Sequence, residues 1–180
     1  MPLYKTQNTI LLENLLRYYN KNNNLDNMLS IINGDSKVSL RIVDWFATNY
    51  SKQNYTIYKL NDGNRFKVYI DYKLKLRAYS KKRFDPFCRW ERITIPYNDK
   101  YIQTTIGQLN FFKWAIENEV INYIENNYIE IERDMNTRNS TTKNKKIYTN
   151  CKTRKKREEL SKSASKSIFK ENIDIIISFD

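Results

Sequence analysis

The amino-acid sequence predicts an α+β fold with N-terminal helices, a small antiparallel sheet, one long packed helix and a basic C-terminal arm. Two periodicities carry this prediction. Apolar residues recur every three to four positions near the N-terminus and again after residue 104, whereas apolar and polar residues alternate over 65–79. We therefore predict an α+β globular domain over 1–136, a flexible basic arm over 137–170, and a C-terminal strand within 171–180 that could rejoin the sheet.

The first part of the chain has the spacing of helices. Helices are predicted over 8–19, 25–33 and 39–53. Asn8 or Thr9 could cap the first helix, because both side chains can accept a hydrogen bond from its first turn. The second is expected to end at Asn33-Gly34, since glycine readily adopts the left-handed conformation that often follows a helix.

A β-hairpin is predicted next. The segments YTIYKL (55–60) and RFKVYIDYKLKLRAY (65–79) flank Asp62-Gly63, a pair that suits a tight turn. Apolar residues in the second segment alternate with mostly basic ones, so a strand there would have one apolar face and one basic face. A third strand, RITIPY (92–97), is expected to stop at Pro96.

The longest predicted helix follows, and Thr105 and Gln108 have the spacing of a capping box at its start. Its apolar residues keep helical spacing as far as Tyr128. Residues 137–167 are then polar and rich in Lys, Ser and Thr, which is typical of a disordered arm or of one that orders on binding. The final apolar segment, NIDIIISF (172–179), has strand character.

The net charge of +12 is concentrated in two blocks. Residues 65–92 hold ten basic and three acidic side chains, and residues 138–170 hold twelve basic and two acidic ones. Between them, residues 93–137 carry three basic and seven acidic side chains, a net −4. Charge concentrated in this way favours a polyanionic partner, in the order nucleic acid, acidic protein and anionic membrane.

The first block supplies most of the candidate binding residues. These are Lys67, Lys73, Lys75, Arg77, Lys81, Lys82, Arg83, Arg89 and Arg92. Tyr69 and Tyr79 fall on the basic face of the predicted strand, and a basic sheet face with aromatic residues can hold single-stranded nucleic acid by charge and stacking. The alternative is an edge strand that lysines keep soluble.

The second block contributes a cluster in the arm. Its candidate nucleic-acid-binding residues are Lys152, Arg154, Lys155, Lys156 and Arg157. Such a cluster could bind nucleic acid, act as a nuclear-localisation patch, form a tail regulated by phosphorylation, or dock an acidic protein partner. The alternative is a solvated run of charge.

Composition excludes most enzyme classes. The chain has no histidine and only two cysteines, which rules out serine triads, Cys-His dyads, zinc sites that contain histidine, and a four-thiolate zinc site within one chain. The acidic residues that could bind Mg²⁺ share no clean helix face, and we interpret them as solvated or charge-neutralising: Glu117, Glu119, Glu125, Glu130, Glu132 and Asp134. We therefore predict no catalytic residue, no metal and no cofactor, and thus no enzyme.

Cys88 lies among basic residues that would lower the pKa of an exposed thiol. Because it stands between Phe87 and Trp90, we interpret it instead as a buried structural thiol. Asp85-Pro86 is expected to form a turn that inserts Phe84, Phe87 and Trp90 into the core and leaves the neighbouring basic residues outside.

Three segments together resemble an uncharacterised family of small basic proteins from giant (nucleocytoplasmic large) DNA viruses. They are AYSKKRFDPFCRWERI (78–93), TTIGQLNFFKWAIENEVINYIE (104–125) and the Lys/Arg-Ser tail that ends in SFD. The resemblance covers about residues 38–180, and Trp90 stands where the family pattern has arginine. It implies a viral-factory or virion setting and no catalytic activity.

The sequence thus favours a viral nucleic-acid-binding accessory protein for DNA or RNA, associated with genome packaging, the virion or the viral factory. The first alternative is a structural protein whose basic arm docks an acidic viral partner. The third hypothesis is a metal-dependent nuclease that uses carboxylates and Mg²⁺. No apolar run approaches the roughly 18 residues of a membrane span, and we expect no membrane association. The expected location is the host cytoplasm, at the viral factory, or the nucleus.

Overall fold

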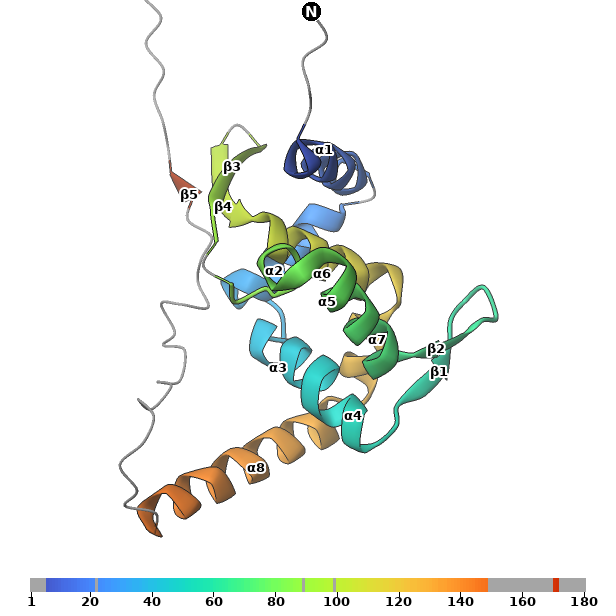
Figure 1. The fold of residues 1–180 in the computed structure, drawn as a ribbon, viewed down its shortest axis with the longest axis vertical. Helices are drawn as coiled ribbons and strands as arrows, with labels where there is room; N and C mark the ends of the chain where they lie inside the picture. The colour runs from blue at the N-terminus through green and yellow to red at the C-terminus, as the bar shows by residue number, and fades with distance from the viewer. Residues whose placement is uncertain (1–5, 22, 89, 99, 149–169, 172–180) are drawn as a thin grey trace, which may run out of the picture.

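The computed structural model describes residues 6–148, apart from 22, 89 and 99, together with residues 170 and 171 (Figure 1). Helices form the body of the protein. The β1–β2 hairpin and the β3–β4 pair lie on opposite sides of this body (Figure 1). The predicted α+β class is therefore confirmed.

Helices fill the N-terminal third as predicted. They are α1 (Gln7–Tyr19), α2 (Asn24–Asn33), α3 (Leu40–Trp45), the π-helical turn η1 (Phe46–Tyr50) and α4 (Ser51–Gln53). The prediction that Asn8 or Thr9 caps α1 is wrong, because the side chain of Thr6 accepts the hydrogen bond from the Thr9 amide at 3.2 Å. Gly34 ends α2 at φ +84°, which confirms the left-handed C-cap.

The hairpin is shorter than predicted. Strands β1 (Ile57–Lys59) and β2 (Arg65–Lys67) pair antiparallel, and Gly63 turns between them at φ +83°. The predicted strand over 65–79 is wrong beyond residue 67, since α5 (Val68–Phe84) follows directly. The predicted basic sheet face therefore does not exist: Lys67 ends β2, whereas Lys73, Lys75 and Arg77 lie on a helix.

The reason for this error is geometric. Apolar residues at every second position also include every fourth position, which is one face of a helix. Val68 and Tyr72 are buried on that face, and Leu76 packs partly against the same core. Ile70 and Leu74, the remaining members of the alternation, are consequently left exposed on the other side.

A second sheet forms from β3 (Arg92–Tyr97), β4 (Lys100–Thr105) and the short β5 (Lys170–Glu171). The predicted strand over 92–97 is confirmed, and its partner β4 was not predicted. Tyr101 pairs with Glu171, so the chain does return to this sheet near its C-terminal end. The predicted strand over 172–179 lies outside the described residues.

The predicted long helix is divided into three: α6 (Ile106–Glu117), α7 (Val120–Asn126) and α8 (Tyr128–Tyr148). The capping box is confirmed on its N-cap side, because the Thr105 hydroxyl oxygen accepts from the Gln108 amide at 3.1 Å. Glu119, at φ +55°, interrupts the helix between α6 and α7. Helix α8 continues through residues 137–148, which corrects the predicted start of the arm; residues 149–169 lie outside the described part.

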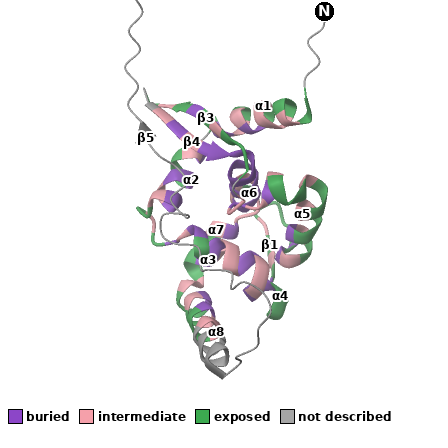
Figure 2. Ribbon diagram, turned by 60° about the vertical axis from the view of Figure 1, so that its left-hand side comes forward, coloured by how far each residue is buried: buried purple, intermediate pink, exposed green. Residues whose placement is uncertain are grey.

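Helix α6 is the centre of the core, and nine of its twelve residues are buried (Figure 2). Its Phe111 and Trp114 contact Tyr72 and Phe84 of α5, with ring centroids 5.6–6.4 Å apart among these four residues. Trp114 Nε1 also donates a hydrogen bond to Asp71 at 2.7 Å. This bond fixes which side of α5 faces α6.

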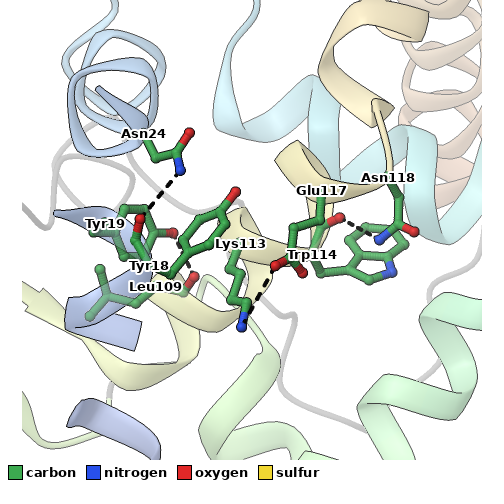
Figure 3. Close-up of polar contacts among 8 residues, drawn as sticks. All are labelled: Tyr18, Tyr19, Asn24, Leu109, Lys113, Trp114, Glu117 and Asn118. Atoms are coloured by element: carbon green, nitrogen blue, oxygen red, sulfur yellow. Dashed lines mark hydrogen bonds and ion pairs between the residues drawn. The ribbon is translucent and has the colours of Figure 1, made fainter. Parts of the chain in front are cut away.

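Helix α1 contacts α6, and Figure 3 shows the polar contacts of this region. The Tyr19 hydroxyl donates to the Leu109 carbonyl oxygen at 2.6 Å. Lys113 Nζ lies 5.3 Å from the Tyr18 ring centroid and 3.7 Å from Glu117 Oε1. Burial, with a smaller contribution from Glu117, raises the pKa of Tyr18 to about 12. Lys113 is therefore engaged within the fold.

The close approach of α6 to the end of α5 requires glycine at position 107. A Cβ atom there would lie 2.8 Å from the Asp85 carbonyl oxygen and 3.2 Å from that of Lys82. We expect Gly107→Val to lower the free energy of unfolding by about 1–3 kcal/mol in urea denaturation, because backbone atoms must move apart. Gly34→Asn is the control, since no atom lies within 4 Å of its Cβ position and Asn tolerates the left-handed conformation. Equal losses in the two variants would contradict this role of Gly107.

Candidate functional site

The outer face of α5 combines basic and apolar side chains. Ile70 and Leu74 are 56% and 57% exposed, and Lys73 and Arg77 are exposed beside them on the same side of the helix. Asp71, the one acidic residue of α5, is turned inward and bonded to Trp114. The outer face consequently has no acidic side chain of its own.

The basic segment, residues 65–92, is divided at Ser80, and cations in its first half have no acidic partner in the described part of the chain. Lys67, at the end of β2, is exposed, and Lys75 is half-buried on α5. Among the described residues, no acidic side chain forms an ion pair with Lys67, Lys73, Lys75 or Arg77. Lys73 and Arg77 are therefore brought together on the outer face of α5, and Lys67 lies just before the helix. Lys75 is two positions from each of them, about 200° round the helix, and does not join this face.

Basic side chains in the second half of the segment contact other residues of the protein. Lys81 pairs with Asp85 at 3.4 Å, and Arg83 Nε donates to Asn8 at 2.7 Å. Lys82 Nζ lies 3.7 Å from the centroid of the Trp90 ring. A non-helical backbone at Ser80, with φ 64° and ψ 162°, separates this half of α5 from the first.

Among the remaining predicted residues, Arg92 is described and does not join the α5 face. Arg92 lies on β3, where its Nη1 donates to Gln103 at 3.5 Å. Arg89 and the arm cluster lie outside the described residues: Lys152, Arg154, Lys155, Lys156 and Arg157. Their predicted contact with nucleic acid stays a prediction.

The turn at Asp85-Pro86 is confirmed, because the Asp85 carboxylate accepts from the Phe87 amide at 2.8 Å. Phe84 is buried as expected and Phe87 packs partly against the core. The prediction that Trp90 is buried is wrong, since it is 40% exposed under Lys82. Cys88 is a half-buried free thiol rather than a fully buried one.

A pocket that the sequence did not reveal lies next to the α5 face. It has a volume of about 260 Å³ and is formed where the α4–β1 connection and the hairpin meet the start of α5. Tyr55 and Tyr69 contribute aromatic rings, and Lys52 and Lys67 contribute cations. Tyr55, at φ +46° and 84% exposed, could not be recognised as special from its neighbours in sequence.

Acidic residues of the C-terminal helices have structural partners. Glu119 accepts from the Asn61 amide at 3.0 Å, Glu130 from the Tyr50 hydroxyl at 2.7 Å and Asp134 from Trp45 Nε1 at 2.9 Å. The part of the chain that the structure describes contains no group of three or more metal-ligating side chains. None of its helices is long and apolar enough to cross a membrane.

Fold and site together define an α+β protein that presents a basic helix face and an aromatic pocket to solvent. The chain belongs to a family of unknown function, DUF7197, whose profile matches residues 3–180. It is 43% identical over 150 residues to the uncharacterized protein L507 of Acanthamoeba polyphaga mimivirus, an alignment that covers 78% of this chain and 54% of that protein. The chain thus spans about half the length of this curated relative. No solved structure matches it.

These comparisons confirm the resemblance to an uncharacterised family with a member in a giant virus.

Asp44 of α3 lies near the end of α5. Its carboxyl group predicts that the free energy of unfolding depends on pH. Burial raises the pKa of Asp44 to about 7; Asp85 adds to the rise and Lys81 opposes it. The folded protein thus holds this proton up to about pH 7, whereas the unfolded chain releases it near pH 4. We expect the free energy of unfolding to fall by roughly 2–4 kcal/mol as pH rises between these values.

The measurement is urea denaturation across this pH range for wild type and Asp44→Asn. The free energy of unfolding of Asp44→Asn should change little over this pH range, because its side chain has no proton to release. Asp35→Asn, which changes an exposed carboxyl group, is the control, and its free energy of unfolding should fall with pH as in wild type. A decline that persists unchanged in Asp44→Asn would assign it to another group.

Proposed function

We propose that this protein is a viral nucleic-acid-binding accessory protein, not an enzyme, and that the outer face of α5 contacts the phosphate backbone. The observation that carries the proposal is the set of unneutralised cations there. Lys67, Lys73 and Arg77 are exposed without acidic partners in the described region. Such a concentration of one charge attracts polyanions and raises association rates.

The dimensions of α5 agree with this role. The part of α5 before the break at Ser80, residues 68–79, extends for about 18 Å, a length that a few nucleotides of a strand can follow. The basic arm beyond residue 148 would add further phosphate contacts. The giant-virus relative supports a viral setting, and we place the protein with the viral genome, in the viral factory or the virion.

A second candidate function rests on a separate observation. Ile70 and Leu74 expose apolar surface between the basic residues of α5. An acidic viral protein with apolar side chains could use them, as in the docking of helices into grooves. Nucleic acid is favoured because the cations extend beyond these two residues to Lys67 and Lys52 at the pocket.

The test is fluorescence anisotropy with labelled single- and double-stranded DNA and RNA across a salt series. We expect binding that weakens with salt, and Lys73→Ala/Arg77→Ala should weaken it on the order of tenfold at low salt. The log–log salt slope should fall by about 1.4 for a single strand, since two phosphate contacts are lost. Lys21→Ala/Arg41→Ala removes two exposed cations from other elements and is the matched control.

Three results would overturn parts of the proposal. Absence of binding by wild type at about 50 mM salt would reject the nucleic-acid function and favour the protein partner. Equal binding by the α5 variant and wild type would move the site from α5 to the arm. Mg²⁺-dependent cleavage of the labelled strands would show that the protein is an enzyme.

A further inference from the structure

We infer that the pocket between the hairpin and α5 receives one unpaired base, so that the protein binds single strands in preference to duplex. This inference rests on the proposed function and adds a specificity to it. It begins from the distribution of exposed apolar side chains. Tyr55, Ile57 and Ile70 are 84%, 51% and 56% exposed, and all three line this one pocket.

The exposed residues are not explained by packing within the protein. Tyr55 has a left-handed backbone, at φ +46°, which is unfavourable for an aromatic residue. Its ring nevertheless stands in solvent at the mouth of the pocket rather than in the core. Tyr55 follows Asn54, the C-cap of α4, and the Thr56 amide donates to the Ser51 carbonyl oxygen at 3.2 Å. The left-handed backbone therefore ends the helix and leaves the ring in solvent, where it can act as a stacking surface.

The pocket chemistry matches a nucleotide. Aromatic rings stack on any base, and lysines beside them can neutralise its phosphate. Tyr69 already has a cation near its ring, since Lys52 Nζ lies 5.7 Å from the ring centroid. Lys67 lies on the same wall. A volume of about 260 Å³ is just below the range of drug-sized ligand sites, which suits a single base and its sugar.

A path for the rest of the strand continues from the pocket. Tyr69 and Ile70 also line a neighbouring groove of about 350 Å³ along α5, whose other residues include Lys73 and Arg77. A strand with one base in the pocket would thus place its next phosphates beside the cations of the proposed interface. Bases of a duplex are stacked and paired inside, so they cannot enter a concave pocket without being unpaired.

The experiment compares three probes of equal length: a single-stranded DNA of 12 nucleotides, the same strand with abasic sites throughout, and the duplex. We expect wild type to bind the intact strand most tightly. Tyr55→Ala should weaken binding of the intact strand by about 5- to 100-fold, the contribution of one stacked base. It should leave binding of the abasic strand and the duplex unchanged.

Two variants control for structure. Tyr55→Phe keeps the ring and should bind like wild type, whereas Ile129→Ala removes an exposed apolar side chain from α8 and should have no effect. Because Tyr55 is exposed, its substitution should not unfold the protein, and circular dichroism of each variant checks this point.

The outcomes separate the two proposals. The base pocket would be overturned if wild type bound intact and abasic strands equally, or if Tyr55→Ala bound the intact strand as tightly as wild type. The proposed function would still stand in that case if binding depended on Lys73 and Arg77. Absence of binding to all three probes would overturn both. An acidic peptide of alternating Glu and Leu that binds wild type but not Tyr55→Ala, with strand binding unaffected, would assign the pocket to a protein partner.

Discussion

The packing of α5 against α6 is the constraint on which the rest of the structure depends. Tyr72 and Phe84 of α5 both contact Phe111 and Trp114 on one turn of α6. Aromatic pairs of this kind each add about 0.5–1.5 kcal/mol beyond the area they bury. The bond from Trp114 to Asp71 then sets the rotation of α5. Lys73 and Arg77 point outward because this inner face is so completely determined.

The same constraint divides the basic segment into two parts with different roles. Near Gly107 the end of α5 lies close against α6, and there Lys81 and Arg83 are bound to other residues of the protein. Before the kink at Ser80, the cations have no such partners among the described residues. Net charge alone therefore overstates the binding surface, since roughly half of the described cations of the segment contribute to folding instead.

Much of the fold could be predicted from local signals. Gly34 and the Thr105–Gln108 cap mark helix boundaries by chemistry that acts within a few residues, and both were recognised. The strand proposed for 65–79 failed because alternation fits a strand and one face of a helix equally well, and only contact with α6 decides between them. The basic residues of the site were identified, but their arrangement followed the helix and was missed. The pocket was missed entirely, because it forms only where the hairpin brings residues 51–57 against the start of α5, and that start was predicted as a strand.

In the proposed function, the cations of α5 would bind the phosphate backbone and the pocket would bind an unpaired base. Attraction between cations and phosphates is largely independent of sequence and strandedness, and it weakens with salt. Stacking of a base depends on the base being unpaired and is much less sensitive to salt. An α5 face that acted alone would bind duplex and single strand alike. The exposed ring of Tyr55 and the half-buried ring of Tyr69 line the pocket together with Lys52 and Lys67. These rings are what would make the same surface discriminate between single strand and duplex.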